Sequence, residues 1–181
     1  WKVNSNQNIT WNASTFYTNV YIEYSTDGGS TWNIVIASTP NDGVHSWAVP
    51  NNLTTQALIR VSNSVGGVSV GATDVSNATF TINLPTPLLT SPNGGEIWRS
   101  GNTHPITWNS STVASNVQIE YSRDNGVTWG VITTSASNTG KYNWTIPKFA
   151  TTTQALVRIT NTSFPSAIDT SDVVFTIKAP I

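Results

Sequence analysis

Two acidic residues near the C-terminal end are the candidates for metal chemistry. Asp169 and Asp172 lie three positions apart in the stretch Ile-Asp-Thr-Ser-Asp, and paired carboxylates can bind Ca²⁺, a cation that prefers oxygen ligands. Calcium sites need several oxygens that converge, however, and an equivalent stretch earlier in the chain has Asn77 in place of the second acid. We therefore expect these carboxylates to cap turns rather than bind a metal, with calcium as the alternative.

A second motif occurs twice in the chain and is defined by five residue positions. It reads Ser-x-Asp-x-Gly-x-Thr-Trp and resembles the Asp box of sialidases and other β-propeller proteins, where it shapes a hairpin turn. The Asp can accept turn N–H groups and the Gly can take a positive φ, so we expect a structural hairpin with the Trp packed beneath it. Two boxes 97 residues apart do not supply a sialidase active site. The residues are Ser25, Asp27, Gly29, Thr31 and Trp32, and Ser122, Asp124, Gly126, Thr128 and Trp129.

Other catalytic groups are scarce. The chain has no Cys and two His, His45 and His104, and neither His recurs at the matching position of the other copy. The absence of Cys excludes disulfides, thiolate nucleophiles and cysteine-ligated zinc. We also expect no strained serine turn of the Gly-x-Ser-x-Gly type, which would present a nucleophile. The sequence thus predicts no catalytic residues, no cofactor and no enzymatic activity.

Exposed aromatic residues could stack on sugar rings. Phe16, Tyr17 and Tyr21 are the candidates in the first half of the chain. The matching positions of the second half hold no aromatic residue, and a shared sugar platform would be expected to repeat. Stacking on a carbohydrate is therefore the alternative interpretation of these three residues.

A tandem duplication supplies the elements that position all these groups. Residues 9–50 align without a gap on residues 106–147, with 21 identities in 42 positions. The repeating unit of about 95–98 residues has the size of a β-sandwich domain, so we predict one domain over 1–84 and another over 85–181. Trp residues that recur in both copies are expected in the two cores; they are Trp11, Trp47, Trp108 and Trp144.

Each copy carries short strand signals separated by turn residues. In the second copy they cover 88–91, 105–109, 116–122, 127–133, 141–146, 154–161 and 173–178. Alternation places Val117, Ile119 and Tyr121 on the inner face of their strand, with the residues between them facing out. We predict an all-β protein of two tandem immunoglobulin-like β-sandwich domains, about seven strands each, without disulfides.

The two copies differ at their starts. Trp1 aligns on Trp98, and the second copy has Leu-Leu-Thr-Ser-Pro-Asn-Gly-Gly-Glu-Ile before that Trp. We therefore expect the first domain to lack its first strand within this sequence and to present a sheet edge with unpaired backbone groups. An upstream segment or a strand from another chain would have to cover it.

The charge content limits the classes of partner. Only eight Lys plus Arg and a net charge of -1 leave little to neutralise a phosphate backbone or an anionic lipid surface. No apolar run approaches the roughly 18 residues that span a bilayer. We expect no nucleic-acid partner and no membrane insertion.

The sequence resembles the immunoglobulin-like repeats of large secreted bacterial surface proteins. The resemblance is carried by SPNGGEIWRSGNTHPITWNSS, NVQIEYSRDNGVTW, YNWTIP and ALVRITN followed by VFTI. It extends distantly to the N-terminal domain of the yeast cell-wall Kre9/Knh family. Such repeats act as spacers, adhesion modules and structural subunits.

The resemblance implies an extracellular or cell-surface structural or adhesive module that contacts neighbouring repeats of the same protein. A homo-oligomer or fibre, completed by β-strand addition at the open edge, is the sharper expectation. The alternative is a carbohydrate-binding module of a secreted glycoside hydrolase, with a polysaccharide as its partner.

Overall fold

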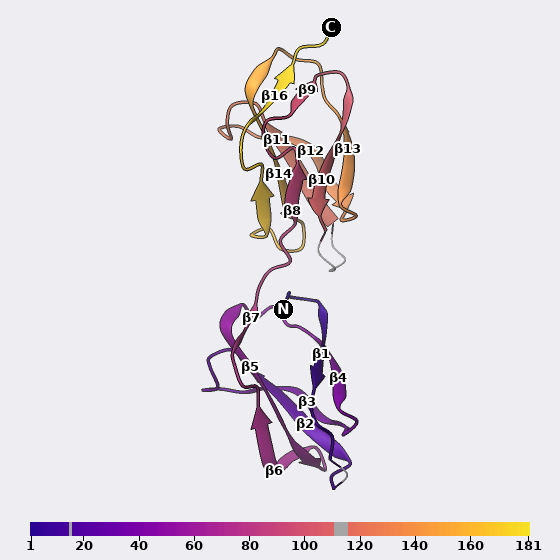
Figure 1. Cartoon of the computed structure of the whole chain (residues 1–181), viewed down its shortest axis with the longest axis vertical. Helices are drawn as coiled ribbons and strands as arrows, with labels where there is room; N and C mark the ends of the chain where they lie inside the picture. The colour runs from indigo at the N-terminus through magenta and orange to yellow at the C-terminus, as the bar shows by residue number, and fades with distance from the viewer. Residues whose placement is uncertain (15, 111–115) are drawn as a thin grey trace. The chain divides into compact units, whose positions relative to one another are not determined.

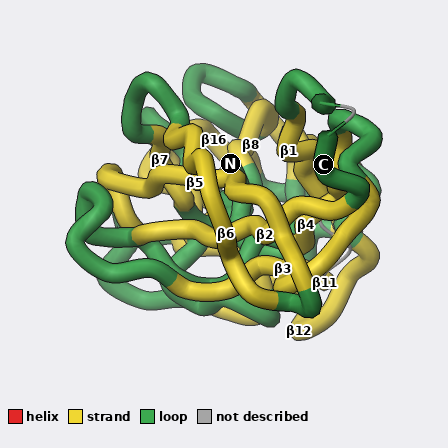
Figure 2. Tube along the Cα trace, turned by 90° about the horizontal axis from the view of Figure 1, so that it is seen from below, coloured by secondary structure: helices red, strands yellow, loops and turns green. Residues whose placement is uncertain are grey.

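The computed structural model describes residues 1–14, 16–110 and 116–181. In these residues strands alternate with loops and no helix is present (Figure 2), so no helix among them is long and apolar enough to cross a membrane. The chain forms two compact units, unit 1 over Trp1–Leu84 and unit 2 over Pro85–Ile181 (Figure 1). The protein is all-β, with one β-sandwich in each unit.

Unit 2 builds its sandwich from nine strands among its described residues. One sheet is antiparallel with the order β13-β10-β8, and the other has the order β12-β11-β14-β16-β9 with β15 paired to β14. Two such sheets facing each other form an immunoglobulin-like sandwich. The strands are β8 (Leu88–Ser91), β9 (Ile97–Arg99), β10 (Thr103–Asn109), β11 (Asn116–Ser122), β12 (Gly130–Ser137), β13 (Lys141–Thr145), β14 (Thr152–Asn161), β15 (Ile168–Thr170) and β16 (Phe175–Lys178).

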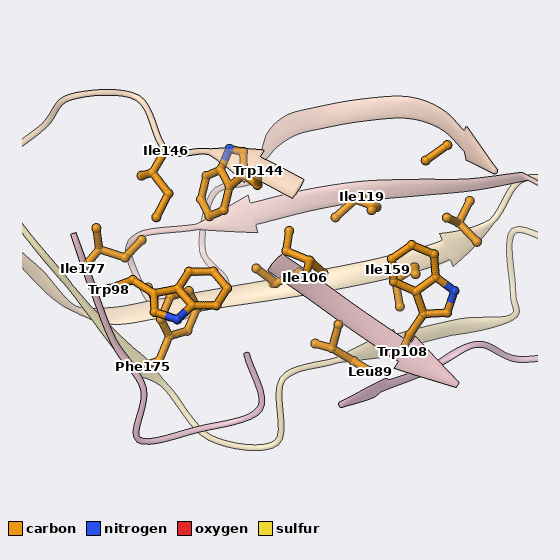
Figure 3. Close-up of a cluster of buried hydrophobic side chains, with 14 residues drawn as sticks. Leu89, Trp98, Ile106, Trp108, Ile119, Trp144, Ile146, Ile159, Phe175 and Ile177 are labelled. Carbon is orange, nitrogen blue, oxygen red and sulfur yellow. The ribbon is translucent and has the colours of Figure 1, made fainter. Parts of the chain in front are cut away.

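The core of unit 2 lies between its two sheets (Figure 3). Strand alternation directs Ile106 and Trp108 of β10 inward from one sheet, and Val117 and Ile119 of β11 inward from the other. Leu89 of β8 joins the same cluster and is 4% exposed. β8 therefore closes one side of the sandwich as well as extending its sheet.

Unit 1 has the same plan with one strand fewer on the smaller sheet. That sheet contains only β1 and β4 among the described residues, while the other has the order β3-β2-β5-β6 with β7 paired to β5. A parallel bridge from Lys2 to Asn83 takes the place of the β9–β16 pairing. The strands are β1 (Asn6–Thr10), β2 (Asn19–Ser25), β3 (Asn33–Pro40), β4 (Val44–Ala48), β5 (Thr54–Val65), β6 (Val68–Val75) and β7 (Phe80–Ile82).

Five predicted strands of unit 2 differ at one or both ends from the observed ones. β10 and β14 begin two residues earlier than predicted, β16 begins two residues later, β13 ends one residue earlier, and β12 is shifted to 130–137. The strand expected at 127–133 begins only at Gly130, because Val127 belongs to the preceding turn and is 80% exposed. The short strands β9 and β15 were not predicted at all. Three residues are too few to show an alternating pattern, and tertiary pairing with β16 and β14 defines them.

Candidate functional site

The repeated Ser-x-Asp-x-Gly-x-Thr-Trp motif forms a hydrogen-bonded turn between two strands. Ser25 Oγ accepts the N–H of Gly29 at 2.8 Å, and Asp27 Oδ1 accepts the N–H of Thr31 at 2.8 Å. Gly29 has a φ of 95°, which favours glycine, and its carbonyl accepts the indole N–H of Trp32 at 3.0 Å. The second copy has the same three bonds at the same distances. Every polar group of the motif therefore serves the turn.

These bonds also stabilise the charged form of the motif's carboxylates. The pKa of Asp27 is lowered to about 2, mainly because the hydroxyl of Thr31 donates to it, then because the Thr31 N–H and the Ser25 hydroxyl do. The pKa of Asp124 is lowered to about 2 by the equivalent groups. A carboxylate that is ionised and engaged in this way is suited to holding a turn and unsuited to donating a proton at neutral pH.

The Trp of each motif also supports an ion pair on the outer face of the larger sheet. The guanidinium carbon of Arg60 lies 4.3 Å from the centroid of the Trp32 ring, and Arg60 donates through Nε and Nη2 to both carboxylate oxygens of Glu23. The hydrogen bonds that Arg60 donates to the Glu23 carboxylate raise the pKa of Arg60. Stacking on one side and a bidentate pair on the other fix the arginine. Unit 2 repeats this arrangement with Arg158, Trp129 and Glu120.

The two acids considered for calcium instead hold the first strand of unit 2 in place. Asp169 Oδ2 accepts the N–H of Leu89 at 2.7 Å. Asp172 accepts from the side-chain amide of Asn93 at 2.7 Å and donates its own N–H to Asn93 Oδ1 at 2.9 Å. Among the described residues no three His, Cys, Asp or Glu side chains gather where a metal ion could be held.

Two further residues that the sequence analysis did not single out complete this docking. The hydroxyl of Ser171 donates to the carbonyl of Pro92 at 2.7 Å and accepts the N–H of Val157 at 3.0 Å. Glu96 accepts the N–H groups of Asn93 and Gly94, each at 2.8 Å. Burial acts to raise the pKa of Glu96, but these N–H bonds outweigh it and the pKa lies below its usual value. The signal in the sequence was the repeated Asp-x-Ser, at positions 74–76 and 169–171.

The other candidate catalytic groups have packing roles. His104 stacks on Trp98 with ring centroids 4.8 Å apart, and burial lowers the pKa of its imidazole. A Gly-x-Ser-x-Gly sequence does occur at 67–71, contrary to the expectation that no such serine is present. Its Ser69 lies in β6 and shares a 2.7 Å hydrogen bond with Ser62 on β5. A nucleophile of this motif needs a strand-to-helix turn, and β6 is part of a hairpin.

The recurrent tryptophans differ between the units in their burial. Trp47, Trp108 and Trp144 are 7%, 4% and 4% exposed, whereas Trp11 is only half-buried. The indole N–H groups of Trp11 and Trp108 each donate to an Asn side chain at 2.7 Å, so the local hydrogen bonding is the same. Three of the four tryptophans predicted for the cores are therefore buried, whereas Trp11 lies partly at the surface.

Trp11 is accessible because it lines a groove on unit 1 of about 240 Å³. β1 forms one wall of the groove and pairs with β4 along its far edge, while no strand pairs with its near edge among the described residues. In unit 2 the near edge of β10 pairs with β8. The groove is lined by Trp1, Asn8, Ile9, Thr10, Trp11, Ile59, Val61, Asp74, Ser76 and Phe80.

The three aromatic residues considered for sugar stacking do not form a flat platform. Phe16 is 84% exposed, and its ring meets that of Tyr17 edge-on, with centroids 5.1 Å apart and planes at 69°. Tyr21 lies on β2 and is half-buried. One exposed ring beside an edge-on neighbour offers a single stacking position.

Comparisons with known proteins found similarity only among solved structures. No protein-family model matches the chain, and no curated protein matches it. The similar structures include fibronectin(III)-like modules of Clostridium thermocellum CbhA, with 15% identity and a TM-score of 0.38 over 98% of this chain and 88% of that one.

Two further solved structures have scores in the same range. One contains the FN1–FN3 domains of chicken CNTN1, with 15% identity and a TM-score of 0.36 over 98% of this chain and 63% of that one. The other is a chimeric titin Z1Z2, with 15% identity and a TM-score of 0.39 over 99% and 91%. The fold assignment rests on the strand pairing described above and does not draw on these superpositions.

Proposed function

We propose that the chain is a non-enzymatic structural or adhesive module of a larger extracellular surface protein, built from tandem immunoglobulin-like units. The observation that carries the proposal is the contrast between unit 2, in which β10 pairs on both edges, and unit 1, in which β1 pairs on one edge only among the described residues and lies above an apolar groove. Unpaired edges are templates for strand addition, which joins domains through backbone hydrogen bonds. We therefore propose assembly with neighbouring repeats or copies into an oligomer or fibre.

The polar side chains support a structural role. The acids of the repeated turn, of the arginine stack and of the β8 docking all accept hydrogen bonds within their own unit. Small turn residues and satisfied polar groups are what a stable spacer domain needs, because each unsatisfied buried group would cost about 1–3 kcal/mol.

A proline on the unpaired edge tests the assembly. The N–H of Trp11 donates to Gly43, on the side of β4, and since backbone groups alternate along a strand, the N–H of Thr10 faces the groove. Thr10→Pro removes that donor without touching the bonds to β4. We expect sedimentation velocity and electron microscopy to detect oligomers or filaments of the original chain and fewer of the variant. If the original chain is a monomer at all concentrations, the proposal is contradicted. The circular dichroism of the variant should match that of the original chain, so that a loss of oligomers is not a loss of fold.

A carbohydrate-binding module remains the second candidate because of Phe16, which is 84% exposed in unit 1. Removal of a stacking ring weakens a sugar site, since stacking supplies much of the contact. A pull-down on insoluble polysaccharides, repeated with Phe16→Ala and Tyr21→Ala, tests this candidate. Binding that both variants abolish would favour it over the structural module.

A further inference from the structure

A shallow hollow of about 460 Å³ lies on unit 2 beside the second copy of the repeated turn. This volume is within the range of small-ligand sites, roughly 300–1,000 Å³. The residues around the hollow belong to β11, to the turn and to the start of β12, so strand pairing and the turn hydrogen bonds hold them in place. They are Tyr121, Arg123, Asp124, Thr128, Trp129 and Gly130.

Arg123 supplies the positive charge of the hollow and is exposed. Its guanidinium carbon lies 3.9 Å from the centroid of the Phe149 ring, and its Nη2 donates to the carbonyl of Ala150 at 3.4 Å. Among the described residues only Arg60 and Arg158 form ion pairs with an acid. A guanidinium has five N–H donors in one plane, so most of the donors of Arg123 are left for a ligand.

The ring on which Arg123 stacks is itself held by several contacts. The Ser100 hydroxyl donates to the carbonyl of Phe149 at 3.2 Å, and the Thr152 hydroxyl donates to the carbonyl of Arg123 at 2.8 Å. The ring of Phe149 is parallel to that of Tyr121, with centroids 6.3 Å apart and planes at 5°. The guanidinium is therefore positioned before a ligand arrives, which reduces the ordering cost of binding.

Unit 1 shows that the repeated turn does not need this arginine. It has the equivalent backbone bond, from the hydroxyl of Thr54 to the carbonyl of Thr26 at 2.7 Å. Thr26 stands at the position of Arg123, and the residues between Pro50 and Thr54 include no aromatic ring. The stacked arginine is thus an addition to unit 2 and not a part of the shared turn.

Asp124 supplies an acceptor next to this donor. Its Oδ1 accepts the hydroxyl of Ser122 and the N–H of Thr128, whereas its Oδ2 accepts the hydroxyl of Thr128. Each carboxylate oxygen has two lone pairs, so Oδ2 can accept one more hydroxyl group. The hollow therefore offers donors for an anion and an acceptor for a hydroxyl on consecutive residues.

We infer that this hollow binds a uronic acid residue of an acidic polysaccharide. The guanidinium of Arg123 binds the sugar carboxylate, Asp124 Oδ2 accepts a sugar hydroxyl, and the rings of Tyr121 and Trp129 contact its C–H groups. A neutral sugar would leave the arginine without an anion. An acidic peptide would bring carboxylates next to Asp124 without supplying hydroxyls. The inference rests on the proposed adhesive role, to which it gives a ligand, and does not depend on assembly at β1.

Trigalacturonate is the probe that tests the inference on the whole chain. We expect saturable binding in NMR titrations, with shifts in the signals of Thr128 and Gly130 and none at the equivalent Thr31 and Asn33 of unit 1. The affinity should fall as NaCl is added, because salt screens exposed ion pairs. The methyl ester of the same trisaccharide lacks the charge and should bind at least about tenfold more weakly.

Three variants identify the group that binds the carboxylate. Arg123→Thr introduces the residue of unit 1 and should weaken binding at least about tenfold, since charge-assisted hydrogen bonds are lost. Arg123→Lys keeps the charge without the planar fork and should give an intermediate affinity. Lys141→Gln removes one positive charge from β13, outside the hollow, and should change the affinity by no more than about twofold. Circular dichroism should show that all three variants fold.

Four results would overturn the inference. The first two are equal affinities of Arg123→Thr and the original chain, and equal affinities of the ester and the free acid. The third is a loss in Lys141→Gln as large as that in Arg123→Thr, because it would mean unspecific attraction to positive charge. The fourth is a penta-aspartate peptide that binds as tightly as trigalacturonate and depends on Arg123, because the ligand would then be an acidic protein segment.

Sedimentation of the same samples separates this inference from the proposed assembly. Arg123→Thr should leave the oligomers of the chain unchanged, and Thr10→Pro should leave the binding of trigalacturonate unchanged. A chain that assembles without binding trigalacturonate would overturn the site and leave the structural role in place. A chain that binds it and never assembles would overturn the fibre and leave the site in place.

Discussion

Unit 1 and unit 2 share their turns, their arginine stacks and most of their core, and they differ at one wall. In unit 2, β8 covers Trp108 and Ile159, while in unit 1 the equivalent Trp11 and Val61 lie along a groove. The hydrogen bonds of the repeated turn join the same atoms in both units, and the bond from the Gly N–H to the Ser hydroxyl is 2.8 Å long in each. Among the described residues the remaining strands pair in the same order in both units, and the packing differs along the surface that β8 covers in unit 2.

The largest expected difference between the units concerns their equivalent tryptophans. Trp108→Ala should lower the free energy of unfolding of unit 2 by about 3–5 kcal/mol, because a buried aromatic ring is removed. Trp11→Ala should cost unit 1 roughly half as much or less, since Trp11 is half-buried. Urea unfolding followed by residue-resolved NMR reports each unit separately. Equal losses would mean that the groove does not expose Trp11.

A smaller difference is expected for the paired aspartates. Asp169→Ala leaves the N–H of Leu89 without its acceptor and should destabilise unit 2 by about 1–3 kcal/mol. Asp74→Ala should change the stability of unit 1 by no more than about 0.5 kcal/mol, because the exposed side chain lies at an open groove. The same urea experiment measures both. A comparable loss in unit 1 would show that Asp74 holds a hydrogen-bond partner within its own unit.

No difference is expected between the two repeated turns as the pH falls. Because the pKa of Asp27 and of Asp124 is lowered from 3.8 to about 2, their contribution to stability is present above pH 3.8 and is lost as the pH falls toward 2. NMR titration of the two carboxylates should give the same low pKa in both units. A value near 3.8 in either unit would show that its turn lacks the threonine hydrogen bonds.

Much of the fold could be predicted because the duplication and the strand alternation are local features of the sequence. The inner positions Val117 and Ile119 are fully buried, and the strands at 88–91 and 116–122 begin and end at the predicted residues. The predicted start of β12 was wrong because the repeated turn extends to Trp129, whose indole N–H donates back to the carbonyl of Gly126. That bond belongs to the turn and is not apparent from hydrophobic periodicity.

The docking of β8 could not be predicted for a different reason. Asp169 is separated from Leu89 by 80 positions, so its role depends on how the sheets fold and not on neighbouring residues. The strand alternation predicts that Glu120 faces out of the sandwich, yet it is only 8% exposed because Arg158 covers it. The surroundings of Asp169 and Glu120 are therefore set by partners that lie far away in the sequence.

Amide exchange along the two equivalent strands β1 and β10 tests the central claim most directly. In the chain alone, the N–H of Thr10 on β1 should exchange quickly and that of Thr107 on β10 slowly, because only β10 pairs with a strand on that side in the described residues. Slow exchange of Thr10, at a rate like that of Thr107, would contradict the account.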